Sequence, residues 1–206
     1  MHPWDPDNES IDDYTEAKCA AIVRHAMGTD AYPFVIRTVR AWTMTAHVAE
    51  RYRAQRIFLV GDAAHRFPPT GGLGLNTGVQ DAHNLAWKIA AVEAGWAADG
   101  LLDSYDTERR PVAQQNADVR LRNAMRMGEV FQALASPDGR GGARAANDGL
   151  RAAIANQAEH FDMLGLQLGV TYESGAIVTD GKEKPPVQSV RNYLPSSRPG
   201  ARVPHA

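Results

Sequence analysis

The sequence predicts an incomplete α/β fold that is mostly helical, and three observations lead to this prediction. An apolar run within Arg56–Val60 leads into a loop rich in Gly and Pro and then into a helical pattern that ends near Ile89. The hydrophobic period therefore changes from strand to helix. Two more long helical patterns follow, over about 101–131 and 143–166. Only two or three strands are predicted, too few for a self-sufficient sheet that covers these helices.

The first predicted elements precede this change of period. Apolar residues at helical spacing predict a helix over Ile11–Met27, closed by Gly28. Residues Phe34–Met44 alternate in a strand-like pattern rich in β-branched and aromatic residues. The run at Arg56–Val60 ends at Gly61 and is typical of a strand buried on both faces.

The later elements are helical, and the chain then loses its regular pattern. In the helix after the loop, apolar residues recur at helical spacing on one side, at Val79, Ala82, Ala86 and Ile89. Polar residues share another side, at Asp81, Asn84 and Lys88. The pattern at 101–131 contains Pro111, which is expected to kink or restart that helix. Residues 136–142 are expected to form a loop. From Gly169 onward no long periodic segment remains, so this tail needs another element to pack on.

Composition excludes several classes of function. The 206 residues are 44% hydrophobic, enough to bury a core, and carry a formal net charge of -2. No basic excess favours a nucleic acid or an anionic membrane surface as a partner. The single Cys19 permits no internal disulfide, and neither a signal peptide nor a membrane-spanning run is recognised, so we expect a cytoplasmic protein. Hydrolase and zinc motifs are absent and the seven histidines show no metal-ligand spacing, so no metal is expected.

The stretch VGDAAHRFPPTGGLGLNTGVQDAHNLAWKI, at 60–89, carries the candidate site. Ligands of open α/β sheets bind beyond the carboxyl ends of strands, and Asp62 directly follows Gly61 at such an end. Its carboxylate could accept hydrogen bonds from ligand hydroxyls, although it could also merely cap a turn. His65 lies in the same stretch and is interpreted as a surface or packing residue, because nothing in the sequence orients it as a base.

The glycines of this stretch and the helix that follows them complete the predicted site. Gly71, Gly72 and Gly74 remove side chains where a flat or anionic group could approach the backbone. The first helical amides, around Leu75 and Asn76, lack internal partners, and the helix dipole favours negative charge in front of them. A ligand with polyol and delocalised anionic parts fits these features.

These residues closely resemble the second flavin motif of the FAD-dependent aromatic hydroxylases of the para-hydroxybenzoate hydroxylase type. The resemblance rests on GDAAH, PPTGGLGLNTG and DAHNLAWKI, and AERYRAQRIFLVGDAAH and LLDSYDTERRPVA extend it in both directions. YLPSSRPGARVPHA resembles the entry to the thioredoxin-like third domain of the phenol and polyketide hydroxylase branch. The resemblance implies a Rossmann-like FAD-binding domain.

The resemblance also implies cofactors and their ligands. The family's chemistry uses FAD, NAD(P)H as transient reductant and O2 to hydroxylate a small aromatic substrate. The aspartate matching Asp62 binds the flavin ribityl chain there, beside Gly61. The residues expected beside the isoalloxazine are those matching Pro69, Gly72, Gly74, Leu75 and Asn76. Catalytic residues are not identified, and Arg40 and Trp42 are either remnants of a ring pocket or ordinary strand positions.

Departures from the family pattern predict a fragment. The family's first motif, G-x-G-x-x-G after an N-terminal strand, is not found, so the pyrophosphate of FAD has no predicted cradle. We expect a remnant of the substrate domain at 1–52, the C-terminal part of the FAD-binding domain at 53–168 and a linker at 169–206. A complementary N-terminal chain or a homo-oligomer would supply the rest. Two alternatives stay open: a non-catalytic, partner-binding remnant, and a flavin oxidoreductase that does not oxygenate.

Overall fold

The structure is a computed structural model that describes residues 7–135, 142–181 and 189–204. The chain divides into two units, Met1–Thr43 and Met44–Ala206, and each is described here by itself. No helix in these described ranges combines the length and the apolar character needed to cross a membrane.

The described part of the first unit contains one short turn, one helix and a segment without regular secondary structure. The 3-10 turn η1 spans Ile11–Asp13 and helix α1 spans Glu16–Met27, and Gly28 ends the helix in the left-handed region at φ 67°. The helix predicted over 11–27 is thus confirmed, with a break between η1 and α1. The strand predicted over 34–44 is wrong, because these residues have no regular secondary structure and pair with no strand among the residues that the structure describes. A β pattern alone gives no ladder without a hydrogen-bonding neighbour.

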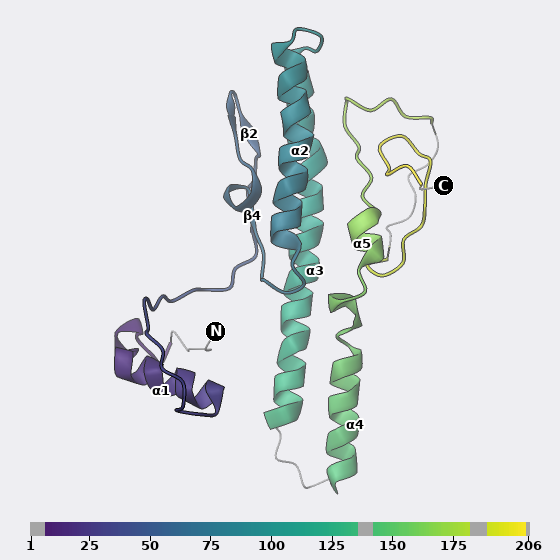
Figure 1. The fold of residues 1–206 in the computed structure, drawn as a ribbon. Helices are drawn as coiled ribbons and strands as arrows, with labels where there is room; N and C mark the ends of the chain where they lie inside the picture. The colour runs from purple at the N-terminus through teal and green to yellow at the C-terminus, as the bar shows by residue number, and fades with distance from the viewer. Residues whose placement is uncertain (1–6, 136–141, 182–188, 205–206) are drawn as a thin grey trace. The chain divides into compact units, whose positions relative to one another are not determined.

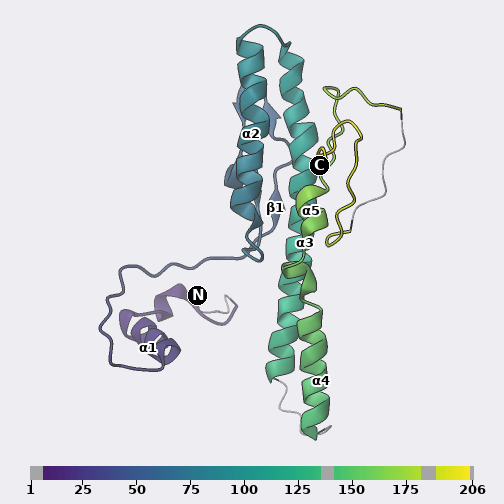
Figure 2. The same cartoon turned by 45° about the vertical axis from the view of Figure 1, so that its right-hand side comes forward.

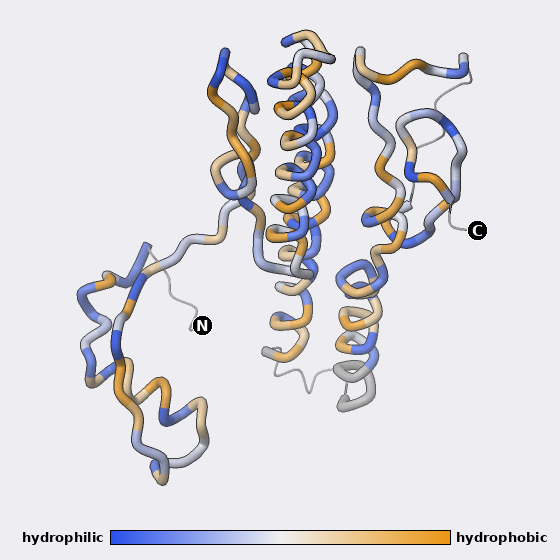
Figure 3. Tube along the Cα trace, turned by 45° about the horizontal axis from the view of Figure 1, so that its top comes forward, coloured by the Kyte–Doolittle hydropathy of each residue, from blue (hydrophilic) through white to orange (hydrophobic). Residues whose placement is uncertain are grey.

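α-Helices dominate the described part of the second unit (Figures 1 and 2). Helices α2 and α3 form a long antiparallel hairpin, and α4 runs beside the far part of α3. The helices are α2 (Leu73–Glu93), α3 (Asp103–Ala135), α4 (Gly142–Ala155) and α5 (Leu164–Leu168), with 3-10 turns η2 (Gly61–Ala63), η3 (Asp99–Leu102) and η4 (Ala158–His160). Figure 3 shows hydrophilic and hydrophobic residues alternating along α2 and α3.

Two sequence expectations about these helices need correction. Helix α3 continues through Pro111, so the expected restart there is wrong, while the expected kink stays a prediction. Val112 and Ala113, which directly follow Pro111, are buried, and this packing offsets the hydrogen bond that proline removes. The helix predicted over 143–166 ends at Ala155 and is followed by η4 and α5. The loop predicted at 136–142 lies almost wholly outside the described residues.

The strands of the second unit are short and antiparallel. Strand β1 (His47–Val48) pairs with β4 (His65–Arg66), and β2 (Arg53–Ala54) pairs with β3 (Ile57–Phe58) in a hairpin. The strand predicted at 56–60 therefore exists in shortened form, but its burial on both faces is wrong, since the side chain of Ile57 is 69% exposed. A strand in a two-stranded hairpin lacks the second neighbour and the covering layers that bury a central strand.

The main core lies where the strands meet the α2–α3 hairpin. Tyr52 and Tyr105 are fully buried there, with ring centroids 5.8 Å apart. The hydroxyl of Tyr105 donates a hydrogen bond of 2.7 Å to the carbonyl of Leu59 and so ties α3 to the segment before η2. This core holds the turn after β3 against the helices.

The tail after Gly169 packs on the helices, as the sequence requires of a segment without its own period. An isolated bridge joins Thr171 to Ala201. Leu166 of α5 and Met163 form a second small cluster with Leu73 of α2 and Val119 of α3. The start of α2 is therefore held by residues of α3 and of the segment around α5.

Candidate functional site

The first part of the site is the turn that follows β3. Gly61 has φ 57° and begins η2, and its N–H donates to a carboxylate oxygen of Asp81 at 3.3 Å. It packs closely on α2, because a Cβ built on Gly78 would lie 3.2 Å from the Cα of Gly61. Asp62 is exposed and makes no hydrogen bond within the described ranges. The turn thus presents a carboxylate at the surface beside α2.

The second part is the N-terminal end of α2. The helix begins at Leu73, two residues before the expected free amides, and its cap residue Gly72 has φ 67° and provides no side-chain cap. The amides of residues 72–75 therefore lack intrahelical partners. Nothing lies within 4 Å of a Cβ built on Gly72 or on Gly74, so open space adjoins their backbone. Pro69 and Asn76 are exposed, and Leu75 is 80% exposed.

These two parts lie close together along α2. Gly61 packs on Gly78, which is five residues after the helix start at Leu73. At a rise of 1.5 Å per residue this separation is roughly 7.5 Å along the helix axis. A single ligand can therefore meet both the Asp62 carboxylate and the uncapped amides.

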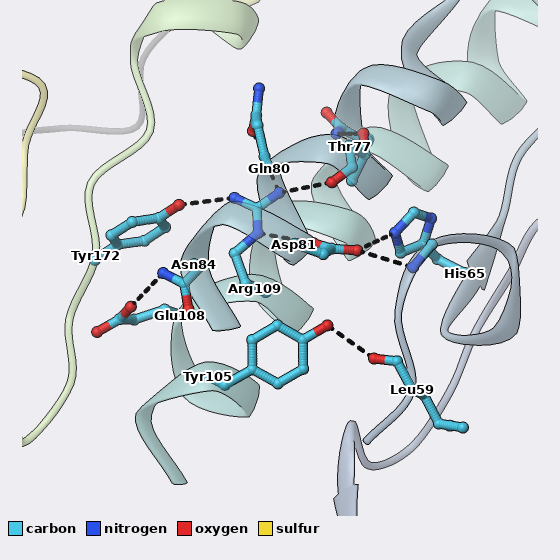
Figure 4. Close-up of polar contacts among 12 residues, drawn as sticks. Leu59, His65, Thr77, Gln80, Asp81, Asn84, Tyr105, Glu108, Arg109 and Tyr172 are labelled. Atoms are coloured by element: carbon cyan, nitrogen blue, oxygen red, sulfur yellow. Dashed lines mark hydrogen bonds and ion pairs between the residues drawn. The ribbon is translucent and has the colours of Figure 1, made fainter. Parts of the chain in front are cut away.

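A buried polar network supports the turn from behind (Figure 4). The carboxylate of Asp81 accepts hydrogen bonds from His65 Nε2 at 2.6 Å and from Arg109 Nε at 2.8 Å, besides that from Gly61. All three side chains are almost completely buried. Because an ionised carboxylate only accepts, Nε2 of His65 carries the proton in this contact. Burial by itself raises the pKa of Asp81, but the hydrogen bonds and charges of its two partners outweigh it and lower that pKa.

Arg109 extends this network to the tail. Its guanidinium donates to Tyr172 Oη at 2.8 Å, to Gln80 Oε1 at 3.2 Å and to the carbonyl of Thr77 at 3.4 Å. The tail, α2 and α3 therefore share one buried cation. Figure 4 shows the guanidinium lying between Tyr172 and Asp81.

Glu108 forms a parallel set of contacts one residue earlier on α3. Its carboxylate accepts from Asn84 Nδ2 at 2.7 Å, from Lys88 Nζ at 2.6 Å and from Ser174 Oγ at 2.6 Å. Burial raises the pKa of Glu108, and these three donors together lower it below its usual range. The tail is thus tied to α3 at two successive residues.

Sequence reasoning missed Asp81, Glu108 and Arg109 as supporting residues. The available signal was the polar set of α2 at helical spacing, which the structure buries, while the apolar set faces outward. The interpretation of His65 as a packing residue is consistent with its burial. The statement that nothing orients it is wrong, because Asp81 holds its ring and Phe67 stacks on it at 4.7 Å.

The other candidate positions lie in the first unit. Arg40 and Trp42 line an apolar cavity of about 580 Å³ together with residues of α1. Cys19 lines the same cavity and its Sγ lies 3.5 Å from the carbonyl of Tyr14.

A strand, a tight turn with an exposed carboxylate and an uncapped helix end are typical of α/β proteins that bind a nucleotide cofactor. The sequence profile of the FAD binding domain matches residues 1–120, more than half of the chain. The chain belongs to the FAD binding domain family.

Individual relatives match almost the whole chain. A putative polyketide hydroxylase of Streptomyces halstedii is 40% identical over 205 residues, which are 98% of this chain and 33% of the relative. The crystal structure of the flavin-dependent monooxygenase PieE in complex with FAD and substrate matches with a TM-score of 0.83 at 34% identity, over 98% of this chain and 38% of that chain. The ternary complex of aklavinone-11 hydroxylase with FAD and aklavinone matches with a TM-score of 0.71 at 32% identity, over 98% and 34%. The chain therefore spans about a third of the length of these proteins.

Proposed function

We propose that this chain forms the ribityl and isoalloxazine side of the FAD site in an FAD-dependent aromatic monooxygenase. The whole protein would use NAD(P)H and O2 to hydroxylate a phenolic or polyketide substrate. In support, one relative is named a putative polyketide hydroxylase and another a flavin-dependent monooxygenase. One observation carries the proposal: the Gly61–Gly78 contact holds the exposed Asp62 carboxylate close to the uncapped N-terminus of α2.

The residues present fit the two chemically different parts of this cofactor. The Asp62 carboxylate would accept hydrogen bonds from ribityl hydroxyls, next to Gly61. The open backbone at Gly72 and Gly74 would admit a flat ring, and Pro69, Leu75 and Asn76 would lie beside it. The amides at the start of α2 would face the ring's polar edge, where the helix dipole favours negative charge. FAD supplies the redox and oxygen chemistry, while these residues bind and orient it.

The domain boundaries belong to the same proposal. Residues 1–52 would be the end of a substrate domain, 53–168 the C-terminal part of the FAD-binding domain, and 169–206 a linker toward a further domain. The tail's hydrogen bonds to Glu108 and Arg109 support a linker that is fixed on the FAD-binding part before it leaves it.

A complementary N-terminal region is the partner that we propose for the outer face of α2. The apolar set on this helix is exposed, with Val79 at 60% and Ile89 at 38% exposure, and Leu75 lies on the turn before it. Burying each such side chain contributes roughly 1.5–3 kcal/mol. Size-exclusion chromatography of the chain with and without the N-terminal region of a close relative tests this. A 1:1 complex supports the proposal, and homo-oligomers that persist in the mixture contradict it.

Flavin titrations test the cofactor site. The variant Asp62→Ala is expected to weaken flavin binding by about 1.5–3 kcal/mol, roughly 10- to 150-fold, because a charge-assisted hydrogen bond is lost. Asp118→Ala, which removes an exposed carboxylate hydrogen-bonded only to Gln114 within the described ranges, is the matched control and should bind as the wild type does. Equal affinities of the two variants would refute the role of Asp62.

A comparison of FMN with FAD tests which half of the cofactor the chain holds. Because the chain contributes no G-x-G-x-x-G turn for the pyrophosphate, FMN and FAD should bind with affinities within about threefold of each other, both weaker than about 1 μM. Saturable quenching of FAD fluorescence at or below about 1 μM, with FMN much weaker, would contradict this assignment.

A further inference from the structure

Arg120 on α3 is a fully buried arginine that contacts the loop in front of α2. Its side chain is 0% exposed, and its guanidinium donates to the carbonyls of Thr70 and Gly71, the latter at 3.4 Å. Its third contact is the sulfur of Met163, at 3.4 Å. The hydroxyl of Thr70 in turn donates to the carbonyl of Arg120 at 3.5 Å. The loop is therefore attached to α3 through this one residue.

The charge of Arg120 has no counter-ion within residues 7–135, 142–181 and 189–204. The other buried arginine, Arg109, pairs with Asp81, and Arg126, two turns further along α3, pairs with Glu159 at 2.5 Å. Arg120 has only carbonyl and sulfur acceptors, and its Nε has no partner. Burial lowers the pKa of Arg120 to about 10, so it remains charged at neutral pH. Buried charges are otherwise paired, because desolvation of an isolated ion is costly.

Gly71 and Arg120 are packed closely together. Gly71 has φ 79°, a conformation that side chains rarely adopt, and a Cβ built on it would lie 1.8 Å from Nη1 of Arg120. Glycine adopts this φ without strain and leaves room for the guanidinium against the loop. Two residues later, Leu73 is buried against Val119, the neighbour of Arg120 on α3. The path of the loop into α2 is therefore set from α3.

We propose that Arg120 is a positioning residue that shapes the loop at 70–72 and places an unpaired positive charge behind the N-terminus of α2. The ligand class that this arrangement favours is a flat, delocalised anion, and the inference rests on the proposed function in taking that anion to be the reduced isoalloxazine of FAD. The charge and the helix dipole have the same sign at this point and act together. The oxidised, neutral ring gains less from them, so the site favours the reduced form.

Three variants separate the role of Arg120 in shaping the loop at 70–72 from the effect of its charge on flavin binding. Arg120→Met removes the charge and the contacts to the loop. Arg120→Lys keeps the charge but cannot reproduce the guanidinium's hydrogen bonds to the carbonyls of Thr70 and Gly71. Arg126→Met is the control, because it removes a charge of the same helix that is paired with Glu159. Hydrogen–deuterium exchange of the amides at 70–76, in the chain without ligand, measures how firmly Arg120 holds the loop. Faster exchange is expected in both Arg120 variants and not in Arg126→Met. Exchange that stays at the wild-type rate in Arg120→Lys overturns the positioning role, even where Arg120→Met fails to fold.

Anaerobic titration of the chain with oxidised and with chemically reduced FAD tests the effect of the Arg120 charge, because it gives the affinity for each redox form. Arg120→Met is expected to lower the ratio of reduced to oxidised affinity about tenfold, which is about 30 mV for a two-electron couple. Arg120→Lys should keep the ratio within about threefold. A ratio that is unchanged in Arg120→Met, or that changes equally in Arg126→Met, overturns the electrostatic role. A wild-type chain that binds neither form overturns the proposed function and this electrostatic role together, while the exchange measurement still decides the positioning role.

Discussion

Arg109 and Arg110 are adjacent arginines of α3 that pair with aspartates in opposite surroundings. Arg109 and its partner Asp81 are completely buried at 2.8 Å, whereas Arg110 pairs with Asp106 at 3.3 Å and the two side chains are 43% and 25% exposed. Removing one member of a buried pair leaves an uncompensated charge and costs about 3–5 kcal/mol. An exposed pair one helical turn apart contributes only about 0.3–0.5 kcal/mol.

The variant Arg109→Met is therefore expected to destabilise the chain much more than Arg110→Met. Asp81 keeps its bonds from His65 and Gly61, which favours the lower end of the range, about 3 kcal/mol. For a chain of this size, each kcal/mol lowers Tm by roughly 2–4 °C, so about 6–12 °C is expected for Arg109→Met and about 1 °C for Arg110→Met.

Circular dichroism of the helical signal during thermal unfolding, at several protein concentrations, measures both shifts. Equal shifts for the two variants would show that the buried network contributes no more than a surface pair. A double variant with Asp81→Asn should recover part of the loss, because it removes the charge that Arg109→Met leaves unpaired.

Three further predictions concern the same region. Gly78→Ala should weaken flavin binding without loss of helicity, since its Cβ would lie 3.2 Å from the Cα of Gly61; Gly128→Ala, with nothing within 4 Å, should leave binding unchanged in the same titration. Because folding lowers the pKa of Asp81, its contribution to stability is present above pH about 4 and is lost as the pH falls further. The stability of Asp81→Asn, followed by circular dichroism during acid unfolding, should therefore fall less steeply with decreasing pH. Tyr172→Phe removes the acceptor for a buried guanidinium and should speed proteolysis of the tail at least severalfold, whereas an unchanged rate would show that this bond does not hold the tail.

Elements with local signals could be predicted from the sequence. The Gly28 cap and the periods of α1, α2 and α3 are encoded within a few turns, and the structure has them close to the expected bounds. The family was also recognisable, because the motif from Gly61 to Ile89 is one continuous segment, whereas the position of the cofactor site stays a prediction.

Features that depend on distant partners could not be predicted. The residues at 34–44 have a strand pattern, but a strand also needs a neighbour, which no local pattern supplies. The polar side of α2 is buried because Arg109 lies 28 residues away from Asp81 in sequence and Tyr172 lies 63 residues beyond Arg109. Without those partners, the apolar side of the helix is the natural choice for burial.

Helix α3 supports the two parts of the candidate site at separate points. Arg109 acts on the Gly61 turn through Asp81, and Arg120 acts on the loop at 70–72 directly. The two arginines are eleven residues apart, roughly 16 Å along the helix. Sites this far apart without shared partners usually have additive effects, within about 0.5 kcal/mol.

The losses in unfolding free energy of Arg109→Met and Arg120→Met, measured by urea denaturation, should therefore sum to that of the double variant. Their effects on flavin binding should not sum, because one cofactor meets both the turn and the loop, and displacing either part removes its fit to the other. A coupling above about 1 kcal/mol in unfolding would show instead that the turn and the loop form one cooperative unit. Comparing the double-mutant cycle for unfolding with the one for flavin binding thus decides whether α3 acts as a rigid support. Such a support would set the spacing between the Asp62 carboxylate and the amides of α2.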